Sequence, residues 1–308
     1  MIRNQWTIRN SVSTSGIGLH TGVDSTITFK PAPENYGIRF VRTDIPNFPE
    51  IKVDIDSVVD ISRGTTIEEK GVRIHTVEHA LAAVSGLRID NVLIELSSKE
   101  PPVMDGSAKD FVACLHNAGF VEQSSPRKVL NITDVVNYSD SEREIDIHVI
   151  PSDRFRVTFM VEYPLPALGT QYEAIYNMEE DFAKEVAPAR TFCFLSEIEM
   201  LKEKGLVKGG SLDNALVIVD KKIDQREVMR LRELFGIEEN LISGANGKVL
   251  RFTNEPVRHK TLDLIGDLAL LGVPIIGHVT AARSGHASNV EFVKMIKSAY
   301  RSELKALK

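Results

Sequence analysis

In the first third of the chain, segments with the apolar pattern of strands are interspersed with segments with the apolar pattern of helices. Residues 24–32 ("DSTITFKPA"), 37–44 ("GIRFVRTD") and 90–96 ("DNVLIEL") alternate or run apolar and end at turn residues, which predicts strands. Residues 72–86 ("VRIHTVEHALAAVSG") and 106–119 ("GSAKDFVACLHNAG") have apolar side chains at helical spacing and end at glycine, which predicts helices. This part is therefore expected to mix strands and helices.

A polar stretch separates this part from the rest of the chain. Residues 122–127, within "EQSSPRKV", are predicted to form a linker that divides the chain into domains of residues 1–125 and 126–308. Within residues 220–256 an additional helix is expected, away from the chemistry. The other predicted elements are strands at 143–152 and 154–164 and helices at 196–205, 255–272 and 288–308.

The two parts echo each other. Residues 75–96 and 258–279 each read as a helix, a glycine and then a mainly apolar strand, although their sequence identity is weak. This order is consistent with two related α+β units, each placing a polar-faced helix at a shared interface.

Composition excludes several classes of protein. The 308 residues are 43% hydrophobic and 26% charged, and the net charge of −6 argues against nucleic-acid binding as the primary role. Two cysteines leave no disulfide framework. The N-terminus lacks an apolar signal segment, and the most apolar run is interrupted by Asp267 and Pro274, so no stable membrane insertion is expected. These features predict a cytoplasmic protein.

The first predicted helix carries a possible metal-binding motif. His75, Glu78 and His79 spell H-x-x-E-H, the signature of one class of zinc peptidase. On a helix these side chains share one face, opposite an apolar face that packs. A metal or catalytic site and an ordinary surface helix both remain open from this segment alone.

A second predicted helix adds acidic groups. His259, Asp263 and Asp267 follow at intervals of four and share a helix face within a very apolar segment, so this face is expected to line an enclosed cleft. His259 and Asp263 are spaced to chelate one divalent ion, and one histidine of the first helix would complete two nitrogens and one carboxylate oxygen. This set leaves a position for water, as in catalytic zinc sites, and it also suits non-haem iron.

A third polar cluster surrounds His286 in "TAARSGHASN", after a predicted strand and before the last helix. A catalytic histidine on a loop and an ordinary turn histidine are equally compatible with this pattern. The glycine-rich "GIGLHTG" near the N-terminus has the wrong spacing for a phosphate-binding loop, and a turn between strands is expected there.

Several motifs together resemble one enzyme family. "HTVEH", "ARTFCF", "GGSLDNA", "RHKTLDLIGD" and "SGHASN", in this order and with "GIGLHTG" and "PPVMDGSA", resemble the zinc-dependent UDP-3-O-acyl-N-acetylglucosamine deacetylases of lipid A synthesis over essentially the whole chain. The resemblance implies an α+β fold of two similar domains whose sheets sandwich the helices, with the active site at the domain interface. It also implies hydrolysis of the substrate's N-acetyl group to acetate and a free 2-amino sugar.

The resemblance also implies roles for individual residues. If the chain follows the family, the H-x-x-E-H match is coincidental and His75 is not a metal ligand. The implied roles are Zn²⁺ ligands at His79, His259 and Asp263, a general base at Glu78, a general acid or electrostatic partner at His286 oriented by Asp267, an oxyanion contact at Thr191 and substrate contacts at Phe192 and Lys260.

Recognition of the substrate requires an apolar slot for its acyl chain and cations for its diphosphate. In the family an inserted segment forms the slot, and the matching residues here, for which ordinary core packing is an equal alternative, are Leu201, Leu206, Val207, Gly210 and Leu212. Arg143 and Lys260 are the expected diphosphate contacts.

Three further possibilities stay open. Some family members continue into an acyl-carrier-protein dehydratase, and the end at "SELKALK" would suit a truncated fusion of that kind. One rival interpretation is an H-x-x-E-H metallopeptidase that uses His75 and His79 with a distant glutamate. The other rival is a non-catalytic binding protein on the same fold.

Overall fold

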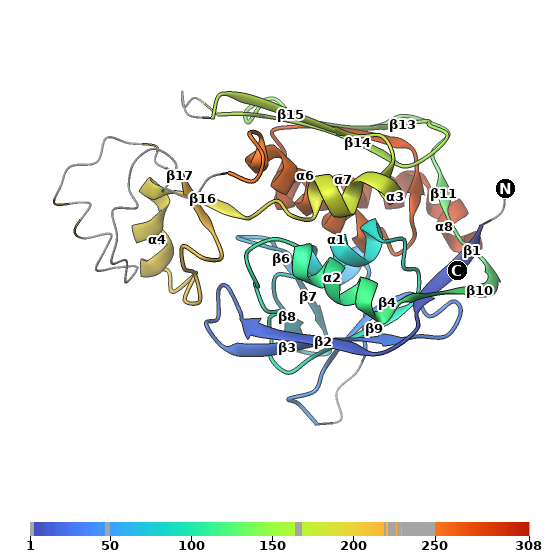
Figure 1. Ribbon diagram of the computed structural model, residues 1–308. Helices are drawn as coiled ribbons and strands as arrows, with labels where there is room; N and C mark the ends of the chain where they lie inside the picture. Colours follow the sequence, from blue (N-terminus) through green and yellow to red (C-terminus); the bar gives the residue numbers. More distant parts are fainter. Residues whose placement is uncertain are drawn as a thin grey trace.

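A computed structural model describes residues 3–46, 50–163, 168–218 and 250–307, together with residues 220, 226 and 229. Two five-stranded sheets lie on opposite sides of a layer of helices (Figure 1). The first sheet has the order β2 (Val12–Ile17), β3 (Asp24–Pro31), β9 (Val92–Leu96), β4 (Ile38–Arg42) and β5 (Ile51–Lys52). The second has the order β12 (Val136–Asp140), β13 (Ile145–Ile150), β19 (His278–Ala282), β14 (Arg156–Glu162) and β15 (Thr170–Ile175).

The two sheets share one topology. Their central strands, β9 and β19, are each antiparallel to one neighbour and parallel to the other, and each outer pair is antiparallel. Each central strand follows a helix and a short connection, which is the order predicted from residues 75–96 and 258–279. The expected α+β class with two similar units is confirmed, whereas the boundary between residues 125 and 126 stays a prediction.

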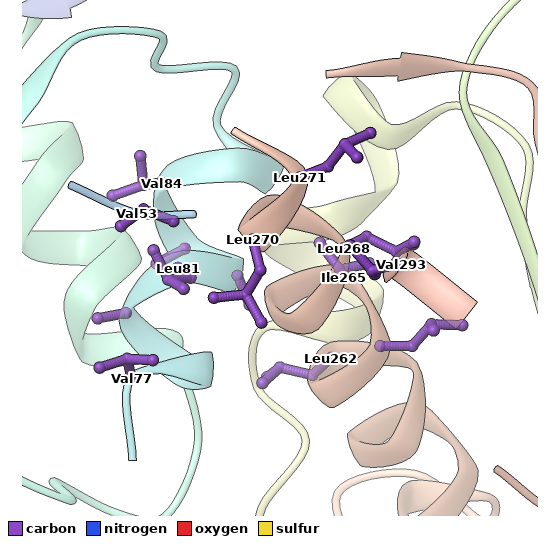
Figure 2. Close-up of a cluster of buried hydrophobic side chains, with 14 of the residues drawn as sticks. Val53, Val77, Leu81, Val84, Leu262, Ile265, Leu268, Leu270, Leu271 and Val293 are labelled. Carbon is purple, nitrogen blue, oxygen red and sulfur yellow. The ribbon is translucent and has the colours of Figure 1, made fainter. Parts of the chain in front are cut away.

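The helical layer forms the shared core. Helix α1 (Glu78–Gly86) packs mainly on α6 (Glu255–Leu268), and α6 also contacts α7 (His286–Ala299). Leu81 and Val84 of α1 and Leu262 and Ile265 of α6 belong to one continuous apolar cluster (Figure 2). Helix α2 (Lys109–Ala118) covers the other side of α1. Because α1 is buried nearly all round, tertiary packing rather than one amphipathic face stabilises it.

Short elements join this frame. They are β1 (Asn4–Ile8), β6 (Val58–Asp60), β7 (Thr66–Glu69), β8 (Val72–Ile74), β10 (Phe120–Pro126), β11 (Leu130–Asn131), α3 (Met178–Asp181), β16 (Phe192–Phe194), α4 (Ile198–Glu203), β17 (Leu216–Ile218), β18 (Ile275–Ile276) and α8 (Arg301–Leu307). In Figure 1, α4, β16 and β17 extend to one side of the layered body.

The local structure differs from the sequence-based expectation at three places. The predicted linker at residues 122–127 is largely strand β10, which pairs antiparallel with β1. The helix predicted from residue 72 begins only at Glu78, because residues 72–74 form β8 and Thr76 adopts a left-handed φ of 55° between them. The last helix begins at His286 instead of residue 288, and α8 follows after Tyr300.

Two further expectations concern membrane insertion and the segment of residues 220–256. No helix in the described part of the chain is long and apolar enough to span a bilayer. The additional helix expected within residues 220–256 lies mostly outside the described residues. The cytoplasmic location stays a prediction.

The crossing of α1 and α6 yields a test of the fold. A Cβ atom at Gly266 would lie 2.2 Å from the backbone oxygen of Glu78, a contact that no side-chain rotation can relieve. We expect Gly266→Ala to lower the free energy of unfolding by about 1–3 kcal/mol through overpacking. Denaturant unfolding measures this loss, with Ser85→Ala on the half-buried last turn of α1 as control. Equal stability of the two variants would mean that the helices do not cross this closely.

Candidate metal centre and active-site cavity

Two helices bring three possible metal ligands together. His79 lies in the first turn of α1, and His259 and Asp263 lie one turn apart on α6. Their ligand atoms all fall within 4.8 Å of one another, and all three residues are buried. The distances to Asp263 Oδ1 are 3.8 Å from His79 Nε2 and 3.4 Å from His259 Nε2.

The surroundings fix the ring of His259. Its Nδ1 lies 3.1 Å from the carbonyl oxygen of Ala189, so an N–H donated there leaves the Nε2 lone pair for a ligand. The neighbouring Arg190 forms a two-point ion pair with Glu255 at the start of α6, with N–O distances of 2.8 and 3.0 Å. This buried pair ties the segment before Thr191 to the helix that carries His259 and Asp263.

Burial and neighbouring charges set the protonation states of this cluster. Burial, reinforced by neighbouring His259, lowers the pKa of His79 to about 3, and burial also lowers the pKa of His259. Burial alone would raise the pKa of Asp263, but the adjacent His259 and Lys260 hold it below its usual range. Two neutral imidazoles beside a carboxylate are the protonation states that a divalent cation requires of its ligands.

Glu78 stands next to the cluster as a buried carboxyl group. It is only 2% exposed, and burial raises its pKa to about 7, against the opposing influence of His286. Its Oε2 accepts a hydrogen bond from the backbone N–H of Thr65 at 2.9 Å, while Oε1 lies 3.8 Å from His286 Nε2. A carboxylate with a pKa near neutrality can both accept and release a proton.

His286 is the first residue of α7 and carries the opposite charge. Its Nδ1 donates to Asp267 Oδ2 at 2.8 Å. Burial alone would lower its pKa, but Asp267, with smaller contributions from Asp263 and Glu78, raises it to about 10. The imidazole is therefore a cation at neutral pH, with Nε2 directed to the region between Glu78 and Asp263.

These groups border one cavity of about 480 Å³. The predicted site residues that line it are Glu78, His79, Arg143, Thr191, Phe192, Leu201, Val207, His259, Lys260, Asp263 and His286. Asp267 is fully buried behind His286. Leu206, Gly210 and Leu212 are not among the lining residues, and Leu212 packs on a small cluster with Leu195, Ile198 and Val217.

Cations and aromatic rings occupy the cavity wall near α6. The Lys260 ammonium group donates to Asp263 Oδ2 at 3.1 Å and lies 6.0 Å from the centre of the Phe192 ring. Arg63 and His20, which the sequence analysis did not single out, also line the cavity, whereas the described structure leaves Arg143 largely exposed at its edge. The wall therefore offers positive charge beside an apolar surface, a combination suited to an anionic amphiphile.

His75 lies outside the metal-binding group. It precedes α1, is half-buried, and places its Nδ1 3.1 Å from the hydroxyl oxygen of Thr66. Among the described residues, the group that could hold a metal contains His79, His259 and Asp263 and not His75. The helical face that the sequence predicted for His75 is therefore wrong.

Glu100 is a buried carboxylate that the sequence analysis missed. Its oxygens accept hydrogen bonds from the backbone N–H groups of His20 and Thr21 and from the hydroxyl of Thr76. These contacts hold the "GIGLHTG" turn against the left-handed residue that precedes α1. No local spacing signals this role, because all three donors are distant in sequence.

Comparison with known proteins gives one consistent family. The family model described as "LpxC: UDP-3-O-acyl N-acetylglycosamine deacetylase" matches residues 5–235 and 238–298. A bifunctional enzyme LpxC/FabZ of Chlorobaculum tepidum is 51% identical over 302 residues, which cover 96% of this chain and 65% of that protein. A UDP-3-O-acyl-N-acetylglucosamine deacetylase of Myxococcus xanthus is 40% identical over 295 residues, covering 96% of this chain and 87% of its own.

A bifunctional enzyme LpxC/FabZ of Bacteroides thetaiotaomicron is 39% identical over 300 residues, or 96% of this chain and 65% of its own. The chain thus spans about 65% of the length of these two bifunctional relatives.

The geometry predicts which substitutions remove a bound metal. His259→Ala and Asp263→Ala each delete one of three possible ligand atoms, and we expect both purified variants to lose nearly all bound metal. His75→Ala should keep the metal, because its ring bonds to Thr66 instead. Metal analysis of the dialysed variants measures this difference. A metal-free His75 variant beside a metal-replete His259 variant would reverse the assignment.

Proposed function

The chain belongs to the UDP-3-O-acyl N-acetylglycosamine deacetylase family, and we propose that it hydrolyses the N-acetyl group of UDP-3-O-acyl-N-acetylglucosamine with the help of one zinc ion. The products are acetate and UDP-3-O-acyl-glucosamine, and the reaction is a step of lipid A biosynthesis. The observation that carries this proposal is the joint placement of two imidazoles, one carboxylate, a buried glutamate and a cationic histidine around a single cavity.

Ligand geometry supports a zinc ion held by His79, His259 and Asp263. Bonds of about 2.0–2.1 Å in a tetrahedral site put neighbouring ligand atoms about 3.3 Å apart. The distances of 3.4 and 3.8 Å to Asp263 Oδ1 are close to this value, and all three ligand atoms lie within 4.8 Å of one another. Three protein ligands leave one position open, as in catalytic zinc sites. Iron in the same set is the alternative that metal analysis distinguishes.

Glu78 and His286 divide the proton transfers between them. A bound zinc ion would acidify a water molecule and polarise the amide carbonyl. Glu78 accepts the proton that the water loses as its oxygen bonds to the carbonyl carbon. His286 then donates the proton from Nε2 to the sugar nitrogen as the C–N bond breaks, because an amine leaves poorly as an anion. The facing atoms of the two residues are 3.8 Å apart, so one small reacting group can contact both.

Neighbouring residues stabilise charge and hold the substrate. Thr191 lines the cavity. Its backbone N–H donates to the carbonyl of Gly106, and its own carbonyl accepts the N–H of Leu216. Its side chain is the proposed donor to the developing oxyanion. Lys260 and Arg143 are the proposed diphosphate contacts, and Phe192 packs on the sugar. Leu201 and Val207 are the lining residues proposed for the acyl chain.

Leu206, Gly210 and Leu212 remain proposed acyl contacts beyond the described cavity wall. They lie in the same segment of the chain as the lining residues Leu201 and Val207, so we propose that an acyl chain longer than the cavity extends to them.

The names of two relatives suggest a longer protein. Both bifunctional relatives extend well beyond the matched region. We therefore propose that this chain is the deacetylase part of a fusion with an acyl-carrier-protein dehydratase. The sequence of the source gene downstream of residue 308 tests this directly.

The peptidase and the binding-protein alternatives receive less support. A peptidase of the H-x-x-E-H class needs His75 as a ligand, yet that ring contacts Thr66 outside the metal-binding group. A binding protein has no need of a buried glutamate and a histidine cation facing each other, since burying ionisable groups costs stability.

Acetate release provides the test of the proposal. The zinc-loaded chain should release acetate from UDP-3-O-acyl-N-acetylglucosamine, lose this activity on chelation and regain it with about one zinc per chain. Glu78→Gln should keep its zinc while turnover falls by about 10²–10⁴-fold, because an amide cannot accept the proton. Glu291→Gln on the exposed surface of α7 is the control and should match the unmodified chain. Binding of the substrate without acetate release would favour the non-catalytic alternative.

A further inference from the structure

Thr65 connects the two proton-transfer residues but does not line the cavity. It is fully buried, directly before β7. Its backbone N–H donates to Glu78 Oε2 at 2.9 Å, and its hydroxyl donates to Asp267 Oδ1 at 2.6 Å. One residue thus contacts the proposed base and the carboxylate that orients the proposed acid.

We propose that Thr65 is a positioning residue that sets Glu78 and His286 relative to each other. This inference rests on the proposed function for the roles of these two residues. Thr65 touches none of the three proposed metal ligands through a described hydrogen bond. It acts through the orientation of two carboxylates and through its hydroxyl oxygen, which lies 3.4 Å from His286 Nδ1, and it does not line the cavity.

Thr65 contacts Glu78 through its backbone. Helix α1 has no side-chain hydrogen bond at its N-terminal cap, and the Thr65 carbonyl accepts the N–H of Val77 at 3.1 Å instead. The Thr65 N–H holds Oε2 of Glu78, so Oε1 faces His286. The approach is close, because a Cβ atom on Gly64 would lie 2.8 Å from that Oε1.

Thr65 contacts Asp267 through its hydroxyl group. Asp267 is fully buried and accepts three hydrogen bonds, from Thr65 on Oδ1 and from His286 and Asn289 on Oδ2. Without the Thr65 hydroxyl, Oδ1 would be buried with no described donor, and an unpaired buried carboxylate oxygen favours rotation of the group. Rotation about the side chain would displace the Oδ2 atom that His286 requires.

A pair of adjacent threonines allows a matched experiment. Thr65→Val removes the hydroxyl while keeping the shape and the backbone N–H. Thr66→Val makes the same chemical change one residue later, where the buried hydroxyl contacts only His75 among the described side chains. Thr65→Ser retains the hydroxyl and serves as the rescue variant. All are prepared as zinc-loaded full chains, with zinc content and melting temperature measured.

We expect Thr65→Val to lower kcat on the order of 10-fold to 100-fold with little change in KM or zinc content. KM should hold because Thr65 does not line the cavity. Thr65→Ser should recover most of kcat, and Thr66→Val should keep it. An unchanged kcat in Thr65→Val, or an equal loss in Thr66→Val, would overturn the inference.

A spectroscopic readout separates this inference from the proposed function. The imidazole N–H resonance that disappears in His286→Gln reports the hydrogen bond to Asp267. We expect this resonance to move in Thr65→Val, to return in Thr65→Ser and to stay in place in Thr66→Val. If the unmodified chain released no acetate, the proposed function would fail while this comparison still tested the positioning. If the resonance did not move in Thr65→Val, the proposed positioning role of Thr65 would be refuted even in an active enzyme.

Discussion

The close crossing of α1 and α6 is the constraint on which the site depends. His79 and Glu78 lie at the start of α1, whereas His259, Asp263 and Asp267 follow successive turns of α6. Only a glycine at position 266 lets the backbone of α6 approach the carbonyl of Glu78. Leu81 of α1 and Leu262 of α6 belong to the continuous apolar cluster around the two helices, so the hydrophobic effect holds the polar groups together.

Burial then gives these polar groups their chemistry. Inside the helical layer, burial favours neutral imidazoles at His79 and His259 and raises the pKa of Glu78, while Asp267 keeps His286 charged. Each effect would be small in water, where charge is well solvated. The arrangement therefore combines two neutral imidazoles and a carboxylate, where a metal is proposed, with an acid and a base beside them.

Local periodicity predicted what local interactions determine. Strands β3, β4, β9, β13 and β14 follow from their apolar patterns, and α2 and α6 follow from helical spacing. The i,i+4 spacing also identified His259 and Asp263 as neighbours. The left-handed Thr76 left no such signal, so His75 was placed on the wrong element. Strand β10 looked like a linker because it is half-exposed and polar, and its pairing with β1 is non-local. The roles of Glu100 and Thr65 depend on hydrogen bonds between distant segments, which no pattern along the chain encodes.

X-ray absorption at the zinc edge tests the proposed ligand set most directly. For the zinc-loaded chain we predict two imidazole nitrogens and oxygen ligands at about 2.0–2.2 Å, with no sulfur. His79→Ala should remove one of the two imidazole signals from any zinc that remains bound. Cys193 also lines the cavity, so a sulfur ligand at about 2.3 Å is the alternative that the spectrum can detect. A sulfur shell, or an imidazole count that did not depend on His79, would contradict a metal centre built where α1 crosses α6.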